Sequence, residues 1–147
     1  MKKYIFFILI ATSFAFTTAD SKRITQEGFS NFLLSKTSMG QILKRYPPEN
    51  PLYGNVESVF IQEQGIKLFF THKVGVDPES VFLNQIDITD PCYARTEKNI
   101  SIGSTVEEVV QQYGIIKDYE TSKLLVYDWI GFYIENKHVN RISVYAK

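Results

Sequence analysis

Cysteine and histidine are scarce in this sequence, which has one cysteine and two histidines in 147 residues. With Cys92 alone, an internal disulfide and a CxxC metal site are both excluded. His72 and His138 stand beside expected hairpin turns, where solvated side chains are the simpler interpretation. No HExxH, GxSxG or phosphate-loop motif accompanies them. We therefore expect no metal, no cofactor and no enzymatic activity.

Cys92 itself leaves two interpretations open. It lies in an expected linker, residues 90–98, between two halves of the chain. It is either a small, partly buried residue between those halves or a reactive thiol that could bridge to another molecule.

An excess of either charge is also missing, since 16 basic residues balance 16 acidic ones. The Lys and Arg residues are scattered and form no basic run, which argues against a nucleic-acid partner. No long apolar run follows residue 16, so we expect no stable insertion in a membrane.

The first 19 residues have the composition of a signal peptide. Lys2 and Lys3 precede the apolar stretch 4–16, and Thr17 and Ala19 are small residues at −3 and −1 of a cut before Asp20. The alternative is an N-terminal anchor that is retained. Cleavage predicts an exported protein, periplasmic or secreted, with residues 20–147 forming a single domain of 128 residues.

Two segments 67 positions apart share a helix-start pattern. In each, a hydroxyl residue (Ser38 or Thr105) precedes Gln41 or Glu108 by three places, which is the spacing of a capping box. Apolar residues follow at i, i+3, i+4 and i+7, typical of a short amphipathic helix. They are Met39, Ile42, Leu43 and Tyr46 in the first segment, and Val106, Val109, Val110 and Tyr113 in the second.

The similarity continues beyond the helices and predicts two repeats, at about 33–90 and 99–147. Residues 64–73 match 128–137 at an offset of 64, and residues 83–88 match 139–144 at an offset of 56. Each repeat then reads helix, strand, strand, strand, with first strands at about 57–62 and 122–127. The first repeat has eight extra residues near 74–80, which we expect to form a longer hairpin loop. Residues 20–35 have no clean period and are expected to be a short lead-in.

Alternation along the strands separates two faces. One parity is wholly apolar, whereas the other mixes polar and aromatic residues. The apolar set is Ile66, Leu68, Phe70, Ile130, Phe132 and Ile134. We therefore predict an α+β fold, in which short helices pack on one face of an antiparallel sheet built from two tandem helix-strand-strand-strand units.

This pattern resembles the family built like the β-lactamase inhibitor protein (BLIP-like), whose tandem units each place a helix before antiparallel strands. It is also similar to the outer-membrane assembly lipoproteins of the SmpA/OmlA (BamE) type. The residues that carry the resemblance are Ile102, Gly103, Ser104, Thr105, Val109, Tyr113, Gly114, Tyr127, Phe132, Ile134, Val139 and Ile142. The resemblance implies a fold that binds other proteins through its open sheet face and loops.

The mixed parity therefore supplies the candidate site for a protein partner. Aromatic residues next to charged ones have the composition of an interface core with its surround. The candidate residues are Phe69, Tyr127, Trp129, Tyr133, Glu135, Arg141 and Tyr145. The alternative is cross-strand pairing that only stiffens the sheet. We expect a protein-binding module of the inhibitor or immunity-factor type; the alternative is a structural or assembly component of the bacterial cell envelope.

Overall fold

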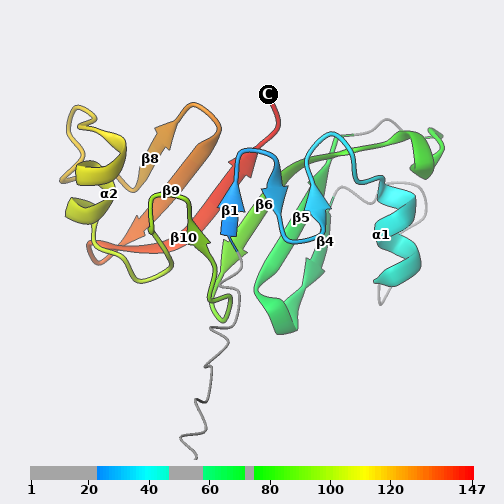
Figure 1. The fold of residues 1–147 in the computed structure, drawn as a ribbon, viewed down its shortest axis with the longest axis horizontal. Coiled ribbons are helices and arrows are strands. Elements are labelled where there is room, and N and C mark those ends of the chain that lie inside the picture. Colours follow the sequence, from blue (N-terminus) through cyan, green and yellow to red (C-terminus); the bar gives the residue numbers. More distant parts are fainter. Residues whose placement is uncertain (1–22, 47–57, 72–74) are drawn as a thin grey trace, which may run out of the picture.

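The computed structural model describes residues 23–46, 58–71 and 75–147. The predicted signal peptide, residues 1–19, lies outside this part of the chain. Figure 1 shows two helices at opposite ends of a twisted six-stranded sheet, with a smaller sheet between them. The helices are α1 (Met39–Arg45) and α2 (Val106–Tyr113). The strands are β1 (Arg23–Thr25), β2 (Gly28–Phe29), β3 (Phe32–Leu33), β4 (Ser58–Ile61), β5 (Ile66–Phe70), β6 (Leu83–Thr89), β7 (Arg95–Thr96), β8 (Leu124–Tyr127), β9 (Ile130–Glu135) and β10 (His138–Tyr145).

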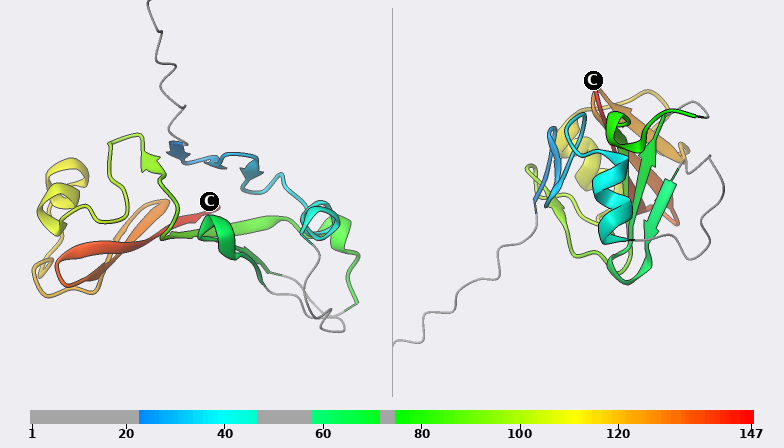
Figure 2. Two further views of the ribbon diagram at one scale, coloured as in Figure 1. Left: turned by 90° about the horizontal axis from the view of Figure 1, so that it is seen from below. Right: turned by 90° about the vertical axis from the view of Figure 1, so that its right-hand side faces the viewer.

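The prediction of an α+β fold with helices covering the sheet is wrong. The described part of the chain is mostly β, with ten strands in two sheets and helices of only seven and eight residues. Much of the cover over the six-stranded sheet comes from the second sheet, in the order β3-β2-β1-β7. Figure 2 shows that this small sheet and both helices lie on the same side of the six-stranded sheet.

The strands that the prediction missed lie in residues 23–33 and 95–96. Three of the four strands in the small sheet have only two residues, too few for a period to show. β1 pairs in parallel with β7, and Ile24 lies opposite Thr96, a contact between distant parts of the sequence. The expected lead-in and linker each contribute strands because this long-range pairing satisfies their backbone groups.

The six-stranded sheet has the order β4-β5-β6-β10-β9-β8, so the last strands of the two repeats meet at its centre. The register agrees with the offsets read from the sequence. Leu68 lies opposite Ile86 in the first half, and Phe132 lies opposite Ile142 in the second. At the central seam, Asp87 lies opposite Ser143, its own equivalent at an offset of 56. The two halves are therefore related by a local twofold axis near this pair.

Both predicted capping boxes are confirmed. Ser38 Oγ accepts from the Gln41 amide at 3.1 Å, and Thr105 Oγ1 accepts from the Glu108 amide at 3.2 Å. Each helix start is also attached to its own half of the sheet. The Met39 amide donates to the Val81 carbonyl at 2.7 Å, and the Val106 amide donates to the Lys137 carbonyl at 3.0 Å. Val106 follows Met39 by the helix offset of 67 positions, and Lys137 follows Val81 by the strand offset of 56 positions. The attachment of helix to sheet is therefore duplicated.

An asparagine marks an irregularity near the start of each central strand. The pairing register shifts next to Asn84 in β6 and next to Asn140 in β10, which are equivalent positions. Asn84 Nδ2 donates to the Thr71 hydroxyl, and Asn140 Nδ2 donates to Glu135 Oε2 at 3.0 Å. A bulge bends its strand and increases the twist, so both halves of the sheet bend at the same place.

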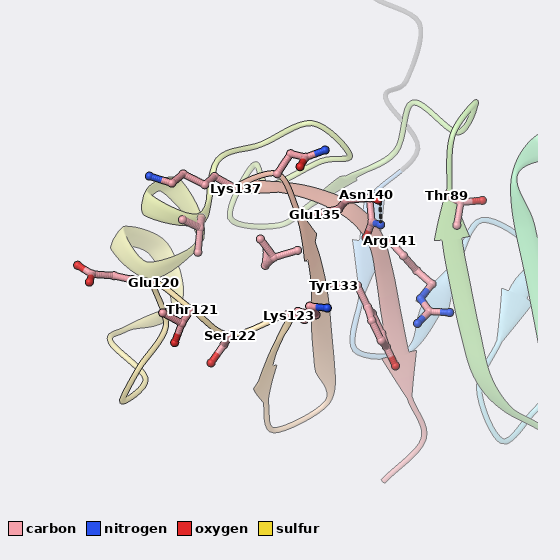
Figure 3. A pocket seen from close by; sticks show the side chains of 13 residues that line it. Thr89, Glu120, Thr121, Ser122, Lys123, Tyr133, Glu135, Lys137, Asn140 and Arg141 are labelled. Atoms are coloured by element: carbon pink, nitrogen blue, oxygen red, sulfur yellow. Dashed lines mark hydrogen bonds between the residues drawn. The ribbon is translucent and has the colours of Figure 1, made fainter.

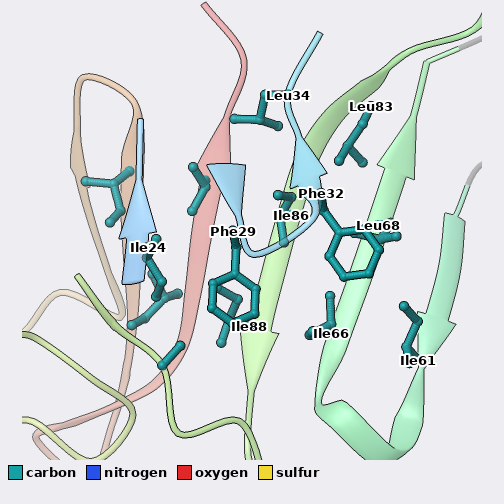
Figure 4. Close-up of a cluster of buried hydrophobic side chains, with 14 of the residues drawn as sticks. Ile24, Phe29, Phe32, Leu34, Ile61, Ile66, Leu68, Leu83, Ile86 and Ile88 are labelled. Carbon is teal, nitrogen blue, oxygen red and sulfur yellow. The ribbon is translucent and has the colours of Figure 1, made fainter. Parts of the chain in front are cut away.

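The core lies between the six-stranded sheet and its covering layer. Figure 4 shows Phe29 and Phe32 from the small sheet facing Ile66, Leu68 and Ile88. The six apolar residues of one parity predicted from the sequence contribute to this core. Five of them are buried, and Ile134 is half-buried. Burial of a side chain such as Leu68 contributes about 1.5–3 kcal/mol to folding, so this layer supplies most of the driving force.

Candidate functional site

The side of the six-stranded sheet that faces away from the small sheet and the helices is here named the open face (Figure 2). Among the described residues, those that belong to this face are Ser58, Phe60, Lys67, Phe69, Gln85, Asp87, Thr89, Leu124, Val126, Gly131, Tyr133, Glu135, Arg141, Ser143 and Tyr145. Five of the seven predicted site residues lie here: Phe69, Tyr133, Glu135, Arg141 and Tyr145. Phe69 and Tyr133 are both half-buried, as their parity predicted.

Arg141 and Tyr133 form the central contact between neighbouring strands. The two residues are register partners on β10 and β9, and Arg141 Cζ lies 3.5 Å from the centroid of the Tyr133 ring. This arrangement is a cation–π contact. The Arg141 side chain remains 37% exposed, and its Nη1 is 3.5 Å from Asp87 Oδ2. The guanidinium is thus held by a ring on one side and a carboxylate on the other.

A buried polar group lies beneath this contact at the central seam. Ser143 Oγ donates to Asp87 Oδ1 at 2.6 Å, and Gln85 Nε2 donates to the same oxygen at 2.8 Å. Asp87 is 4% exposed and Ser143 is fully buried. Sequence analysis missed this group, although the 56-residue offset that relates Asp87 to Ser143 was available to indicate it. Donors around a buried carboxylate satisfy it, and their geometry fixes the register of the two halves.

Tyr145 covers the neighbouring part of the seam. Its hydroxyl lies over Gly131, where an added Cβ would be 3.1 Å from Tyr145 Oη. Burial raises the pKa of Tyr145 above its usual 10.0, a hydrogen bond with Ser143 lowers it, and the nearby Tyr133 and Asp87 raise it. The neutral phenol is therefore the form that this environment favours.

The flanks of the open face are apolar. On the first half, Lys67 Nζ lies 4.9 Å from the centroid of the Phe69 ring, and Phe60 on the edge strand β4 is 56% exposed. On the opposite edge strand, β8, Leu124 and Val126 are 38% and 52% exposed. The open face therefore has one cation–π contact near its centre, a second on its first half, and apolar side chains at both edges.

A hollow of about 770 Å³ extends from the open face around the β9–β10 hairpin (Figure 3). It includes three predicted site residues, Tyr133, Glu135 and Arg141, together with Lys123 and Glu120 from the segment before β8. Charges of both signs line it, which suits a polar protein surface better than a single small ion.

The structure separates two predicted residues, Tyr127 and Trp129, from the open face. Tyr127 shares the parity of the buried Leu125 and packs against Tyr113 of α2, with ring centroids 5.3 Å apart. Trp129 lies in the two-residue turn between β8 and β9. Glu135, by contrast, shares the parity of Tyr133 and lies at the exposed end of β9, where it accepts a hydrogen bond from Asn140. Proximity in sequence to the second turn grouped Tyr127 and Trp129 with Tyr133, but the sheet assigns Tyr127 to its covered side.

The residues considered for other chemistry are dispersed. His138 is exposed, and its Nδ1 is 2.8 Å from the Asn136 carbonyl oxygen, whereas His72 lies outside the described residues. Cys92 is half-buried. Within residues 23–46, 58–71 and 75–147, no three His, Cys, Asp or Glu side chains gather as metal ligands would. In the same ranges, neither helix has the length and apolar character needed to cross a membrane.

The chain was compared with models of protein families, with curated proteins and with solved structures. None of the three comparisons gave a significant match. The resemblance to BLIP-like and BamE-like proteins therefore stays a prediction from the residues that carry it.

Proposed function

We propose that this chain is an exported, non-enzymatic protein that binds another protein through the open face, as an inhibitor or immunity-type factor. The observation that supports the proposal is the open face itself. None of the described helices and strands covers it, yet it carries Arg141 stacked on Tyr133 near its centre and the further aromatic residues Phe60, Phe69 and Tyr145.

The chemistry of this face fits a protein partner. Exposed apolar side chains lie at both of its edges, and Tyr and Arg are enriched where binding energy is concentrated. Arg141 is already stacked on Tyr133 and close to Asp87, so it loses little side-chain freedom on binding. A preorganised side chain of this kind increases affinity because less entropy is lost.

The test compares variants on the two faces of the sheet. The mature chain, residues 20–147, is used to capture proteins from its source, and the captured partner is then titrated by calorimetry. Phe69→Ala combined with Tyr133→Ala should leave the chain folded and weaken binding about 30-fold or more, because truncation of an interface anchor costs about 2 kcal/mol or more.

Two controls make the result specific. Tyr93→Ala and Ile115→Ala remove side chains that are 90% and 82% exposed but lie outside the six-stranded sheet, and they should bind like the unmodified chain. If the Phe69, Tyr133 variant folds and binds the same partner with unchanged affinity, the open face is not the site. If that variant fails to fold, the rings serve to stabilise the sheet instead.

Export is tested separately. N-terminal sequencing of the protein recovered from its natural source should begin at Asp20 or within a residue or two of it. A chain that still starts at Met1 and stays with the membrane fraction would contradict export but would leave the open-face test intact.

A further inference from the structure

A second hollow, of about 300 Å³, lies at the α2 end of the molecule and is here named the end pocket. It is formed where α2, the segment before Ile100 and the turn between β8 and β9 come together. Its wall includes Tyr113, Tyr127 and Trp129, with the carboxylates of Glu97 and Asp128 and the amine of Lys98. Tyr127 and Trp129 are two of the predicted site residues that the structure removes from the open face.

Hydrogen bonds and ring contacts hold the two tyrosines of this wall and the backbone of the turn that carries Trp129. The Tyr127 hydroxyl donates to the Gly114 carbonyl at 2.8 Å, which fixes the ring against the end of α2. Tyr113 contacts both Tyr127 and the buried Phe132, with ring centroids 5.3 Å and 4.9 Å apart. The Trp129 carbonyl accepts from the Tyr145 amide at 2.9 Å, so the turn is attached to the last strand.

Aromatic faces and carboxylates together favour a cation. The face of an aromatic ring carries negative potential, and several rings around one site are a common way to bind an ammonium group. Glu97 and Asp128 add two negative charges at the margin of the end pocket. The aromatic part of the wall suits the alkyl groups of an organic cation, which a small inorganic ion lacks.

The protein already places an ammonium group of its own against this wall. Lys98 Nζ lies 4.6 Å from the centroid of the Tyr113 ring and donates to the Gln112 carbonyl at 2.8 Å. Lys147 Nζ likewise lies 2.5 Å from Asp128 Oδ2. Both lysine side chains are thus bound by the groups that would receive an external cation.

We propose that the end pocket is a binding site for an organic ammonium group. The group is either a small free cation with a choline-like head or the side chain of a lysine on another protein. The site is distinct from the open face, because Tyr113 and Tyr127 belong to the covered side of the sheet. Binding displaces Lys98 from the Tyr113 ring and keeps the carboxylate of Glu97 as a counter-charge.

The only tryptophan of the chain provides a direct probe, because Trp129 lies in the wall of the end pocket. Choline added to the mature chain should change the Trp129 emission in a saturable way. Its neutral carbon analogue, 3,3-dimethyl-1-butanol, should bind about tenfold more weakly, since it lacks the charge that a cation–π contact requires. Sodium chloride at equal ionic strength is the control for screening.

The same titration distinguishes the two sources. Nα-acetyl-lysine amide binding tighter than choline points to a lysine side chain, and the reverse order points to a free quaternary cation. A neutral analogue that binds as tightly as choline, or a choline titration without a saturable change, overturns the proposal.

Two variants connect the signal to the end pocket. Glu97→Gln keeps the shape but removes a charge, so choline should bind several-fold more weakly. Lys98→Gln removes the internal competitor, so choline should bind several-fold more tightly. Glu107→Gln, an exposed change on α2 outside the end pocket, should have no effect. If Lys98→Gln fails to fold because its bond to Gln112 is lost, Glu97→Gln decides alone: unchanged binding in that variant rejects the site.

Discussion

At the scale of single residues, the central seam depends on a glycine that makes room for a tyrosine. Gly131 is buried between Tyr145 and Leu124, and the absence of a side chain lets the Tyr145 ring lie across β9. Tyr145 in turn lies close to Ser143 and Asp87, the buried pair that joins the two halves. Gly131 therefore leaves room for the Tyr145 ring, which lies beside the buried pair of Asp87 and Ser143.

We expect Gly131→Ala to destabilise the fold by about 1 kcal/mol or more, because overpacking at a close contact typically costs about 1–3 kcal/mol. The new Cβ would lie 3.1 Å from Tyr145 Oη but 3.4 Å from the nearest ring carbon. In a Tyr145→Phe background the same change should therefore cost less. Urea melts of the two single variants and the double variant measure this coupling. Equal costs in both backgrounds would show that Tyr145 does not lie over Gly131.

The Tyr145 phenol also predicts a response to alkaline pH. Because its pKa is raised mainly by burial, the folded state holds the proton more tightly than the unfolded state, whose pKa is near 10.0. Stability is fully present below that value and is lost as the pH rises through the higher, folded pKa. Urea melts between about pH 8 and about pH 11 should show a smaller alkaline loss for Tyr145→Phe than for the unmodified chain. An identical loss in both chains would mean that Tyr145 titrates as an exposed phenol.

At the scale of elements, the two helices begin alike but differ in what supports them. Ser38 Oγ donates to Glu79 Oε2 at 2.8 Å, and Lys44 Nζ lies 2.5 Å from Glu79 Oε1. Glu79 belongs to the eight-residue insert and lies against Gly40, where an added Cβ would be 2.5 Å from its carboxyl carbon. Hydrogen bonds from Lys44 and then Ser38 lower the pKa of Glu79. The insert therefore supports α1, whereas α2 has no equivalent.

We expect Thr105→Ala to cost about 0.5–2 kcal/mol, the usual range for loss of an N-cap hydroxyl. Ser38→Ala should cost as much or more, because Ser38 is buried and also donates to Glu79. The matched control is Thr105→Ser, which keeps the capping oxygen and should be close to neutral. Chemical denaturation measures all three variants. Unchanged melts for both alanine variants would show that the capping boxes do not stabilise the helices.

At the scale of the whole molecule, the two halves share one sheet and one core. β6 and β10 pair along five residue pairs at the centre, and Asp87 and Ser143 connect them through their side chains. Ile24 and Phe29 of the small sheet belong to the same buried cluster as Leu68 and Phe132. A continuous core of this kind favours unfolding of both halves as one cooperative unit.

We therefore expect Leu68→Ala to lower the free energy of unfolding by about 2–5 kcal/mol, because it opens a cavity at a fully buried position. Native-state hydrogen exchange should then show an equal loss of protection in β5 and in β9, since both exchange through global unfolding. Phe132→Ala is the matched change in the second half. If Leu68→Ala weakens protection only in the first half, the repeats unfold independently.

The features that could be read from the sequence are those that depend on neighbouring residues. The capping boxes at Ser38 and Thr105 span three positions, and the alternation of Leu68 with Phe69 has a period of two, so both are visible in a short window. The repeat offsets added the register, because equivalent residues in two copies of a hairpin pair equivalently. Half-burial of Phe69 and Tyr133 followed from the same alternation.

Tertiary structure decided what depends on contacts between distant segments. The pairing of β1 with β7 turned an expected lead-in and linker into a second sheet, and with it changed the fold class. Assembly of the six-stranded sheet divided the candidate residues: it placed Tyr133 and Arg141 on the open face and Tyr127 beside α2. A side chain's parity is a local property, but its neighbours are set by strand order and by the layer that covers the sheet. For that reason the sequence determined which residues alternate, and only the assembled sheets determined which of them meet.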